Sequence, residues 1–192
     1  PNGIGPEIIL KALSEEDSLS GIIPIIYSEL DIIEFYLNHL SIKADVNIID
    51  DPMKAKYGRL NIFQLSNSNF KVDFGQQKKE SGQVAFQSLS KASEHAVKNL
   101  IDGIVTAPID KNTIQGDNFN FNGHTEYLTS ITNKNESLML MAHDKLKVGI
   151  VTNHLSIDQV SKAITVGAIL NKISLMDQLS LIHISEPTRP NF

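Results

Sequence analysis

The sequence has no cysteine, and only 6% of its 192 residues are aromatic. Without thiols the chain can form no disulfide, no thiolate metal site and no cysteine nucleophile, which fits a reducing compartment such as the cytoplasm. No apolar run approaches the roughly 18 residues that a membrane-spanning helix needs. Hydrophobic residues make up 41% and charged residues 20%, a composition typical of a globular protein.

An excess of positive charge is also missing. The net charge is −5 at pH 7, and Lys78 and Lys79 are the only adjacent pair of basic residues. A surface for nucleic acid or anionic membranes would require clustered Lys and Arg. The composition therefore argues against a nucleic-acid or anionic-membrane partner.

Both ends of the chain are unusual. It begins at Pro1 with no initiator Met and no signal-peptide pattern, and an α/β domain rarely begins inside a Gly-Pro turn. We therefore expect a strand upstream. Residues 179–189 resemble the translation of a transposase sequencing adapter, so 179–192 are predicted to be a non-native tail. The alternative is a genuine helix end followed by a Pro-containing loop.

Hydrophobic spacing predicts alternating helices and strands. The expected helices cover residues 6–13, 29–40, 82–100 and 125–132 and a segment that starts at 156, where Ser156 and Gln159 form a capping box and Thr165 caps the next helix. The expected strands cover residues 21–28, 44–49, 59–64, 104–107, 138–142 and 148–152. Several strands are apolar on both faces, which indicates an α/β fold with a mostly parallel sheet. Ligands of such sheets bind at the carboxyl ends of the strands.

Two segments near helix starts could bind an anion. Gly3-Ile4-Gly5-Pro6-Glu7 places two glycines before a helix, although a Gly-Pro turn is more often just a turn. Residues 105–111 (VTAPIDK) form an apolar strand that ends at Pro108 and then presents Lys111, whose ammonium could hold a carboxylate or phosphate. A solvated helix start is an equally good interpretation of this second segment.

The segment Gly123-His124-Thr125-Glu126 lies at a predicted loop-to-helix junction. It offers an imidazole, a hydroxyl and free amides to one anion. The alternative is that Thr125 merely caps the helix while His124 is exposed.

Residues 151–156 (VTNHLS) place His154 at the end of an apolar strand, just before a helix. A metal ligand would lie at this position, facing the cleft. Taken alone, such a histidine is more often structural.

The order of these motifs is more specific than any one of them. GIGPE, an SGxxAxxSLxxA helix from Ser81 to Ala92, VTAPIDK, GHTE, MLMA and VTNHLS follow one another along the chain. Over residues 1–178 this series resembles the 4-hydroxythreonine-4-phosphate dehydrogenases of pyridoxal-phosphate (vitamin B6) biosynthesis and their decarboxylating relatives.

The resemblance implies an isocitrate/isopropylmalate-dehydrogenase-like fold of two α/β/α domains, here truncated. Residues 1–108 would belong to the first domain and 109–178 would begin the second. It also implies a cytoplasmic homodimer that uses NAD or NADP and a divalent metal (Zn, Mg or Co) to oxidise and decarboxylate 4-phosphooxy-L-threonine.

By position, His124 and Thr125 match the family's substrate-binding pair, and His154 matches its first metal-binding histidine. The motifs that carry the other two metal histidines, Asn-Pro-His and Tyr-His-Asp, do not occur in this sequence. We therefore expect the fragment itself to be inactive. As a hypothesis of our own, Lys111 adds positive potential to the substrate pocket.

Three other interpretations stay open at this point. One is a related β-decarboxylating dehydrogenase with another phosphorylated or aromatic diol substrate. Another is a phosphate acyltransferase, whose α/β domains use similar Gly and Thr loops without NAD. The third is a non-catalytic module in which GHTE and GIGPE bind a small anion.

Overall fold

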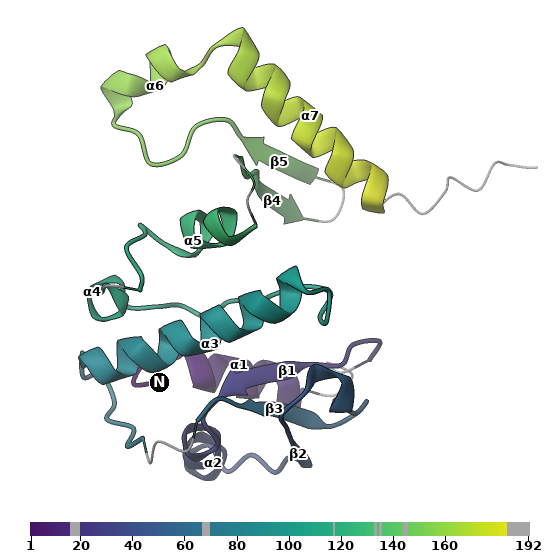
Figure 1. Cartoon of the computed structure of the whole chain (residues 1–192), viewed down its shortest axis with the longest axis vertical. Coiled ribbons are helices and arrows are strands. Elements are labelled where there is room, and N and C mark those ends of the chain that lie inside the picture. The colour runs from purple at the N-terminus through teal and green to yellow at the C-terminus, as the bar shows by residue number, and fades with distance from the viewer. Residues whose placement is uncertain are drawn as a thin grey trace, which may run out of the picture. The chain divides into compact units, whose positions relative to one another are not determined.

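The computed structural model describes residues 1–15, 20–66, 70–116, 118–132, 134, 136–143 and 146–183. The chain divides into two compact units, residues 1–134 and residues 135–192 (Figure 1). The expected domain boundary between residues 108 and 109 falls inside the first unit. Because the compact units of this chain need not coincide with the domains of a longer protein, that division stays a prediction.

The first unit is a parallel sheet covered by helices. Its elements in chain order are α1 (Gly5–Ser14), β1 (Ile25–Ser28), α2 (Leu30–His39), β2 (Val46–Ile49), the 3-10 turn η1 (Pro52–Lys54), β3 (Leu60–Gln64), α3 (Lys79–Val97), α4 (Lys111–Ile114) and α5 (His124–Ile131). The strand order is β1-β3-β2, and Ile62 of β3 lies in register with Ile26 of β1 and Ile48 of β2. This confirms the parallel α/β sheet that the sequence predicts.

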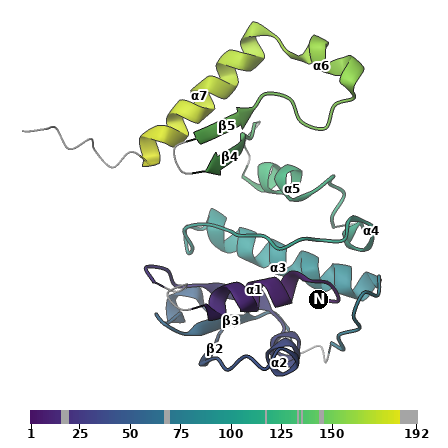
Figure 2. The same ribbon diagram turned by 180° about the vertical axis from the view of Figure 1, so that it is seen from behind.

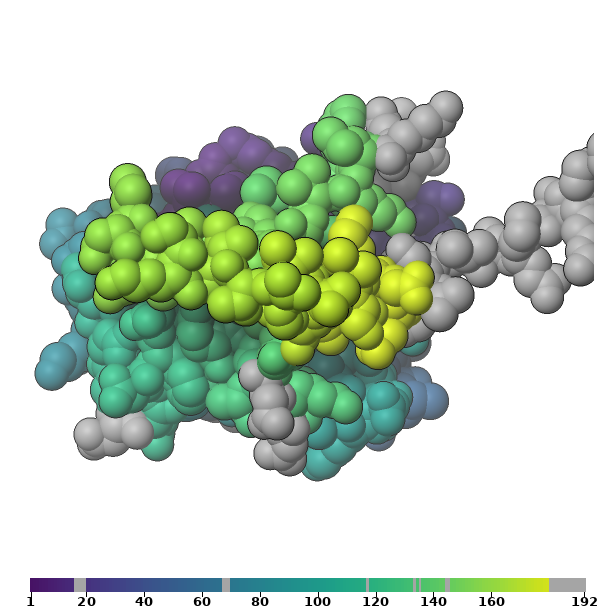
Figure 3. Space-filling model, turned by 90° about the horizontal axis from the view of Figure 1, so that it is seen from above, coloured from purple at the N-terminus to yellow at the C-terminus, as the bar shows by residue number. Residues whose placement is uncertain are grey.

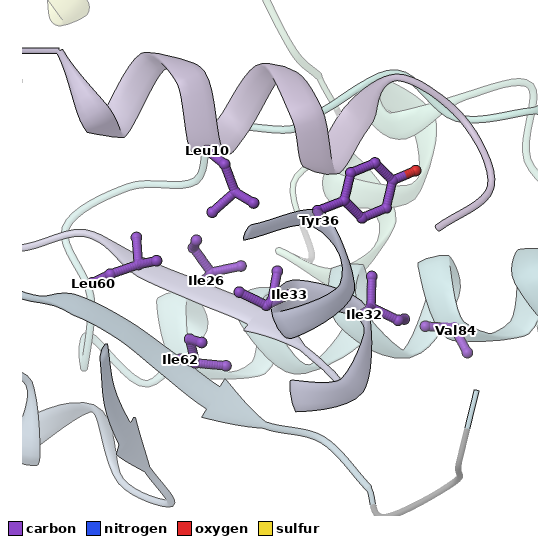
Figure 4. Packing of buried hydrophobic residues seen from close by; sticks show 8 residues of the cluster. All are labelled: Leu10, Ile26, Ile32, Ile33, Tyr36, Leu60, Ile62 and Val84. Carbon is purple, nitrogen blue, oxygen red and sulfur yellow. The ribbon is translucent and has the colours of Figure 1, made fainter. Parts of the chain in front are cut away.

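The two faces of the sheet pack against different helices. Ile26 and Ile62 point toward α1 and α2, where the main core gathers (Figure 4). Its buried members are Leu10, Ile26, Ile32, Ile33, Tyr36, Leu60, Ile62 and Val84. On the other face Tyr27 stacks on Phe63 and lies 2.9 Å from Nδ1 of His95 in α3. His95 is therefore a buried packing residue.

A buried amide organises the amino-terminal side of the sheet. Asn61 has no exposed surface. Its Nδ2 lies within 3.2 Å of the carbonyls of Pro24, Lys56 and Arg59, and its Oδ1 accepts from the Lys56 amide and from Asn47. One side chain thus joins the segment before β1 to the connection between β2 and β3.

The expected strand at residues 104–107 is wrong. The structure assigns no strand there, and the Val105 side chain is 99% exposed. A strand exists only through hydrogen bonds to a neighbour, and no described strand pairs with this segment. The β-rich composition of residues 104–107 was therefore not sufficient to predict a strand.

The second unit is smaller and its sheet is antiparallel. It contains β4 (Met139–His143), β5 (Leu146–Ile150), α6 (Ile157–Ala163) and α7 (Val166–His183). Met141 pairs with Val148, and a Cβ placed on Gly149 of β5 would lie 3.5 Å from the Met176 sulfur of α7. The helix therefore packs closely on the strand.

The helix starts of the second unit match only half of the predicted caps. The Thr165 hydroxyl accepts the Ala168 amide at 3.1 Å, which confirms that cap. Ser156 stands at the N-cap of α6 but makes no side-chain capping bond, so the predicted capping box is wrong.

Large apolar side chains stay exposed on α6 and α7, the green-to-yellow helices at the surface in Figure 3. Exposure reaches 93% for Ile157, 75% for Val166 and 60% for Leu170. Among the described helices, none is long and apolar enough to span a membrane. The predicted tail begins inside α7, residues 184–192 lie outside the described part of the chain, and the tail assignment stays a prediction.

Replacing Asn61 by Ala should lower the free energy of unfolding by about 3 kcal/mol, because buried backbone groups lose their partner. Urea denaturation of the chain measures this change. Asn47→Ala is the matched control, since it removes one bond to Asn61 and one exposed bond to the Lys54 carbonyl. Its cost should be below about 1 kcal/mol. Equal losses in the two variants would contradict the central role of Asn61.

Candidate functional site

The glycine segment at the start of the chain is held by the side chain of Asn2. The Asn2 Oδ1 accepts the Asp73 amide at 3.0 Å, and its Nδ2 donates to the Gln76 carbonyl at 3.0 Å. The Asn2 carbonyl also accepts the Gly75 amide at 2.8 Å. Asn2 is 5% exposed, so this clamp between GIGPE and segment 72–76 is shielded from water.

A tyrosine of α2 also holds residues 1–3 in place. The Tyr36 hydroxyl of α2 lies 2.7 Å from the Pro1 carbonyl and 2.9 Å from the Gly3 carbonyl, and its ring lies in the core beneath α1 (Figure 4). Burial, with the nearby Glu7 carboxylate, raises the pKa of Tyr36. The hydroxyl therefore stays protonated, and its O–H group donates a hydrogen bond that these two carbonyls share.

The motifs GIGPE and VTAPIDK lie side by side. A Cβ on Gly5 would stand 3.2 Å from the Ala107 Cβ, which is tighter than an ordinary contact. The glycine thus permits close packing of the α1 start against residues 107–108, where a side chain would push Ala107 aside. This finding favours a structural role for Gly5 over direct ligand contact.

The short helix α4 presents Lys111 at its first position. Asp110 is the N-cap, and its Oδ1 accepts the amides of Asn112 at 3.1 Å and Thr113 at 2.8 Å. These hydrogen bonds lower the pKa of Asp110. The Lys111 side chain is exposed, and within the described part of the chain its ammonium has no ion-pair or hydrogen-bond partner.

The helix α5 begins with the GHTE motif. Its N-cap is Gly123, which makes no side-chain capping bond. Thr125 lies within the first turn, so the interpretation of Thr125 as a simple cap is wrong. His124 is half-buried, and burial lowers its pKa, so the imidazole is neutral near pH 7.

One hydrophobic cluster joins α4 and α5. Ile114 of α4 and Tyr127 of α5 pack with Leu89 of α3 and Phe119, all less than 10% exposed. The Gln115 amide also donates to the Phe121 carbonyl at 2.7 Å, just before the GHTE motif. The structure therefore places Lys111, His124 and Thr125 in the same compact unit, on the helices α4 and α5 that Figure 2 shows.

His154 belongs to the second unit. It is exposed and lies between β5 and α6 with a backbone φ of +52°, the left-handed region that most residues avoid. Among the described residues no group of three or more His, Asp or Glu could hold a metal ion. The residues that the structure describes therefore do not complete a divalent-metal site by themselves.

Sequence reasoning missed three residues that connect the motif segments to one another. Asn2, Gln77 and Gly82 act through contacts with distant segments, and Gln77 is hydrogen-bonded to Asp110 across 33 positions. The only sequence signal for them was the glycine of the SGxxA motif, because a conspicuous helical glycine often marks close backbone packing.

Comparison with known proteins identifies the family. The profile of the family described as pyridoxal phosphate biosynthetic protein PdxA matches residues 21–188. The chain belongs to this family. The match extends into the segment 179–192 that the sequence marks as non-native.

Relatives and solved structures agree with this assignment. A 4-hydroxythreonine-4-phosphate dehydrogenase of Bacteroides thetaiotaomicron is 35% identical over 175 residues, which are 91% of this chain and 48% of the relative. A protein of Fusobacterium nucleatum, provisionally named D-threonate 4-phosphate dehydrogenase, is 28% identical and covers 90% of this chain. The chain spans about half the length of these curated relatives.

The fold is the same as in solved members. The crystal structure of a 4-hydroxythreonine-4-phosphate dehydrogenase from Burkholderia phymatum matches with a TM-score of 0.82 and 26% identity, over 90% of this chain and 53% of that one. The enzyme from Klebsiella pneumoniae gives a TM-score of 0.81 at 25% identity, over 96% of this chain and 58% of that one. The α/β dehydrogenase fold is therefore confirmed for the part that this chain represents.

The buried histidines make stability dependent on pH. Burial holds the pKa values of His95 and His124 below the ordinary 6.5, so the unfolded chain binds protons more readily. This contribution is fully present above pH 6.5 and is lost as the pH falls below it. We expect the free energy of unfolding to decrease between about pH 7 and pH 5, and His95→Gln with His124→Gln to flatten that slope. Urea titrations at each pH measure it, and an unchanged slope in the double variant would argue against this cause.

Proposed function

We propose that this chain is the substrate-binding first half of a 4-hydroxythreonine-4-phosphate dehydrogenase. The whole enzyme would oxidise the secondary alcohol of 4-phosphooxy-L-threonine with NAD, and the resulting β-keto acid would lose carbon dioxide. The observation that carries the proposal is that the motifs GIGPE, VTAPIDK and GHTE lie in one compact unit. The helices α4 and α5, which carry Lys111, His124 and Thr125, are joined by one buried cluster through Ile114 and Tyr127.

The chain's own residues would bind and orient the phosphorylated substrate. The first turn of α5 has no side-chain cap, so its amides and dipole favour an anion there. The Thr125 hydroxyl and the neutral His124 imidazole supply hydrogen-bond donors at the same helix start. Lys111 would add positive potential, since it has no competing partner within the described residues.

The remaining cofactors depend on residues outside this chain. A divalent metal would supply Lewis-acid polarisation of the substrate oxygen, and His154 is the one residue of this chain that we assign to it. Its left-handed backbone supports that role, because such strain clusters at functional sites. The nicotinamide cofactor (NAD or NADP), a cytoplasmic location and a homodimer stay predictions for the full-length protein.

A direct test uses the full-length protein that carries this sequence. Supplied with 4-phosphooxy-L-threonine and a divalent metal, it should reduce NAD, and chelation should abolish the reaction. Turnover of D-threonate 4-phosphate alone would assign it to the other named branch of its relatives. Acyl-phosphate turnover, or anion binding without any turnover, would reject the dehydrogenase.

His154→Asn sharpens this test. Asparagine tolerates the left-handed backbone, so the fold should survive while bound metal and activity are lost. Metal content by elemental analysis and melting temperature separate the two effects. Retained metal at wild-type stoichiometry would remove His154 from the site.

Lys111→Met should raise the KM for the phosphorylated substrate about tenfold, a loss of about 1.4 kcal/mol of binding, because one charge-assisted contact disappears. The kcat should change little, since the contact is present in both ground and transition states. Lys111→Arg is the matched control that keeps the charge. An unchanged KM in Lys111→Met would contradict the proposed role of Lys111 in substrate binding.

A further inference from the structure

The carboxylate of Asp110 is held from two sides. Its Oδ1 accepts the Asn112 and Thr113 amides and so caps α4. Its Oδ2 accepts a hydrogen bond from the Gln77 amide at 2.9 Å. The residue that directly precedes Lys111 therefore has a fixed side-chain orientation.

The distance of the α4 backbone from α3 is also fixed. A Cβ on Gly82 of α3 would stand 1.9 Å from the Thr113 carbonyl oxygen and 2.8 Å from the Ile114 nitrogen. Real Cβ atoms do not approach backbone so closely, so the two helices touch backbone to backbone only because residue 82 is glycine. Ile114, buried in the shared cluster, anchors the other side of α4.

Gln77 itself extends from an anchored segment. The residues before it are clamped to Asn2 by three hydrogen bonds that are mostly shielded from water. The neighbouring Lys78 forms an ion pair with Asp73 at 2.7 Å. Because the backbone around Gln77 is anchored, its hydrogen bond can hold the Asp110 carboxylate in place. A donor on a flexible loop would instead move together with the carboxylate.

We propose that Gln77 and Gly82 are positioning residues of the substrate site: Gln77 orients Asp110 and thereby the start of α4, while Gly82 sets the depth of that helix. Together they determine where the Lys111 ammonium stands relative to His124 and Thr125. The inference rests on the proposed role of Lys111. A lysine whose backbone is fixed loses less freedom when it engages an anion, which is how preorganised sites gain affinity.

The kinetic test compares two adjacent glutamines in the full-length enzyme. Gln77→Ala should raise the KM for 4-phosphooxy-L-threonine roughly three- to tenfold, with the kcat, the KM for NAD and the melting temperature unchanged. Gln76→Ala is the matched control, because Gln76 takes part in the clamp through its backbone carbonyl. It should leave every constant unchanged.

A double variant distinguishes positioning from direct contact. If Gln77 acts through Lys111, adding Gln77→Ala to Lys111→Met should raise the KM no further. An additive increase would overturn the proposal, because Gln77 would then contribute a contact of its own. A raised KM in Gln77→Ala together with a normal KM in Lys111→Met would overturn it as well.

Hydrogen exchange of the substrate-free protein gives a readout that does not require activity. Peptides that cover residues 110–116 should exchange faster in Gln77→Ala and in Gly82→Ala than in wild type or Gln76→Ala. Unchanged exchange in Gln77→Ala would overturn the proposal even where Gly82→Ala fails to fold. Faster exchange in a protein without dehydrogenase activity would support the positioning of α4 while rejecting the proposed function.

Discussion

The contact between the α3 and α4 backbones at Gly82 is the constraint on which the placement of α4 in the first unit depends. The Thr113 carbonyl lies where any side chain at position 82 would stand. Since α3 also covers one face of the parallel sheet through His95 and Tyr27, this contact fixes α4 relative to the sheet. The buried cluster then extends the same rigidity to α5. A helix of only four residues can hold a precise place because larger elements surround it.

Much of this fold could be predicted from the sequence. The helical spacing in residues 6–13 and 29–40 predicts α1 and α2 to within one or two residues at each end, because each helix buries one apolar stripe. The strand expected at 104–107 shows the limit of such reasoning. Its β-rich residues favour an extended chain, but a strand is a property of a pair, and no described strand lies in register with Val105. The Ser156 capping box failed for a similar reason, because a cap is defined by side-chain geometry.

The sequence was enough to select the candidate site residues by type, but it did not indicate the residues that hold their segments in place. His124, Thr125 and Lys111 are reactive residue types at helix starts, so local sequence was enough to select them. Asn2 and Gln77 have ordinary amide side chains, and their importance comes from partners 71 and 33 positions away. No local pattern encodes those separations. Positioning residues are therefore expected to be found by structure, and ligand-contacting residues by motif.

His154 shows how backbone conformation can indicate what a side chain does. At a φ of +52° glycine would be free of strain, whereas an L residue in the left-handed region costs about 1 kcal/mol or more. A side chain kept there at such a cost and left exposed at the end of β5 does not stabilise the unit by burial. This conformation is therefore in keeping with the functional role that we propose for the His154 imidazole. The residues that we propose for substrate binding thus lie in the first unit of this chain, and His154, which we propose as a metal ligand, lies in the second.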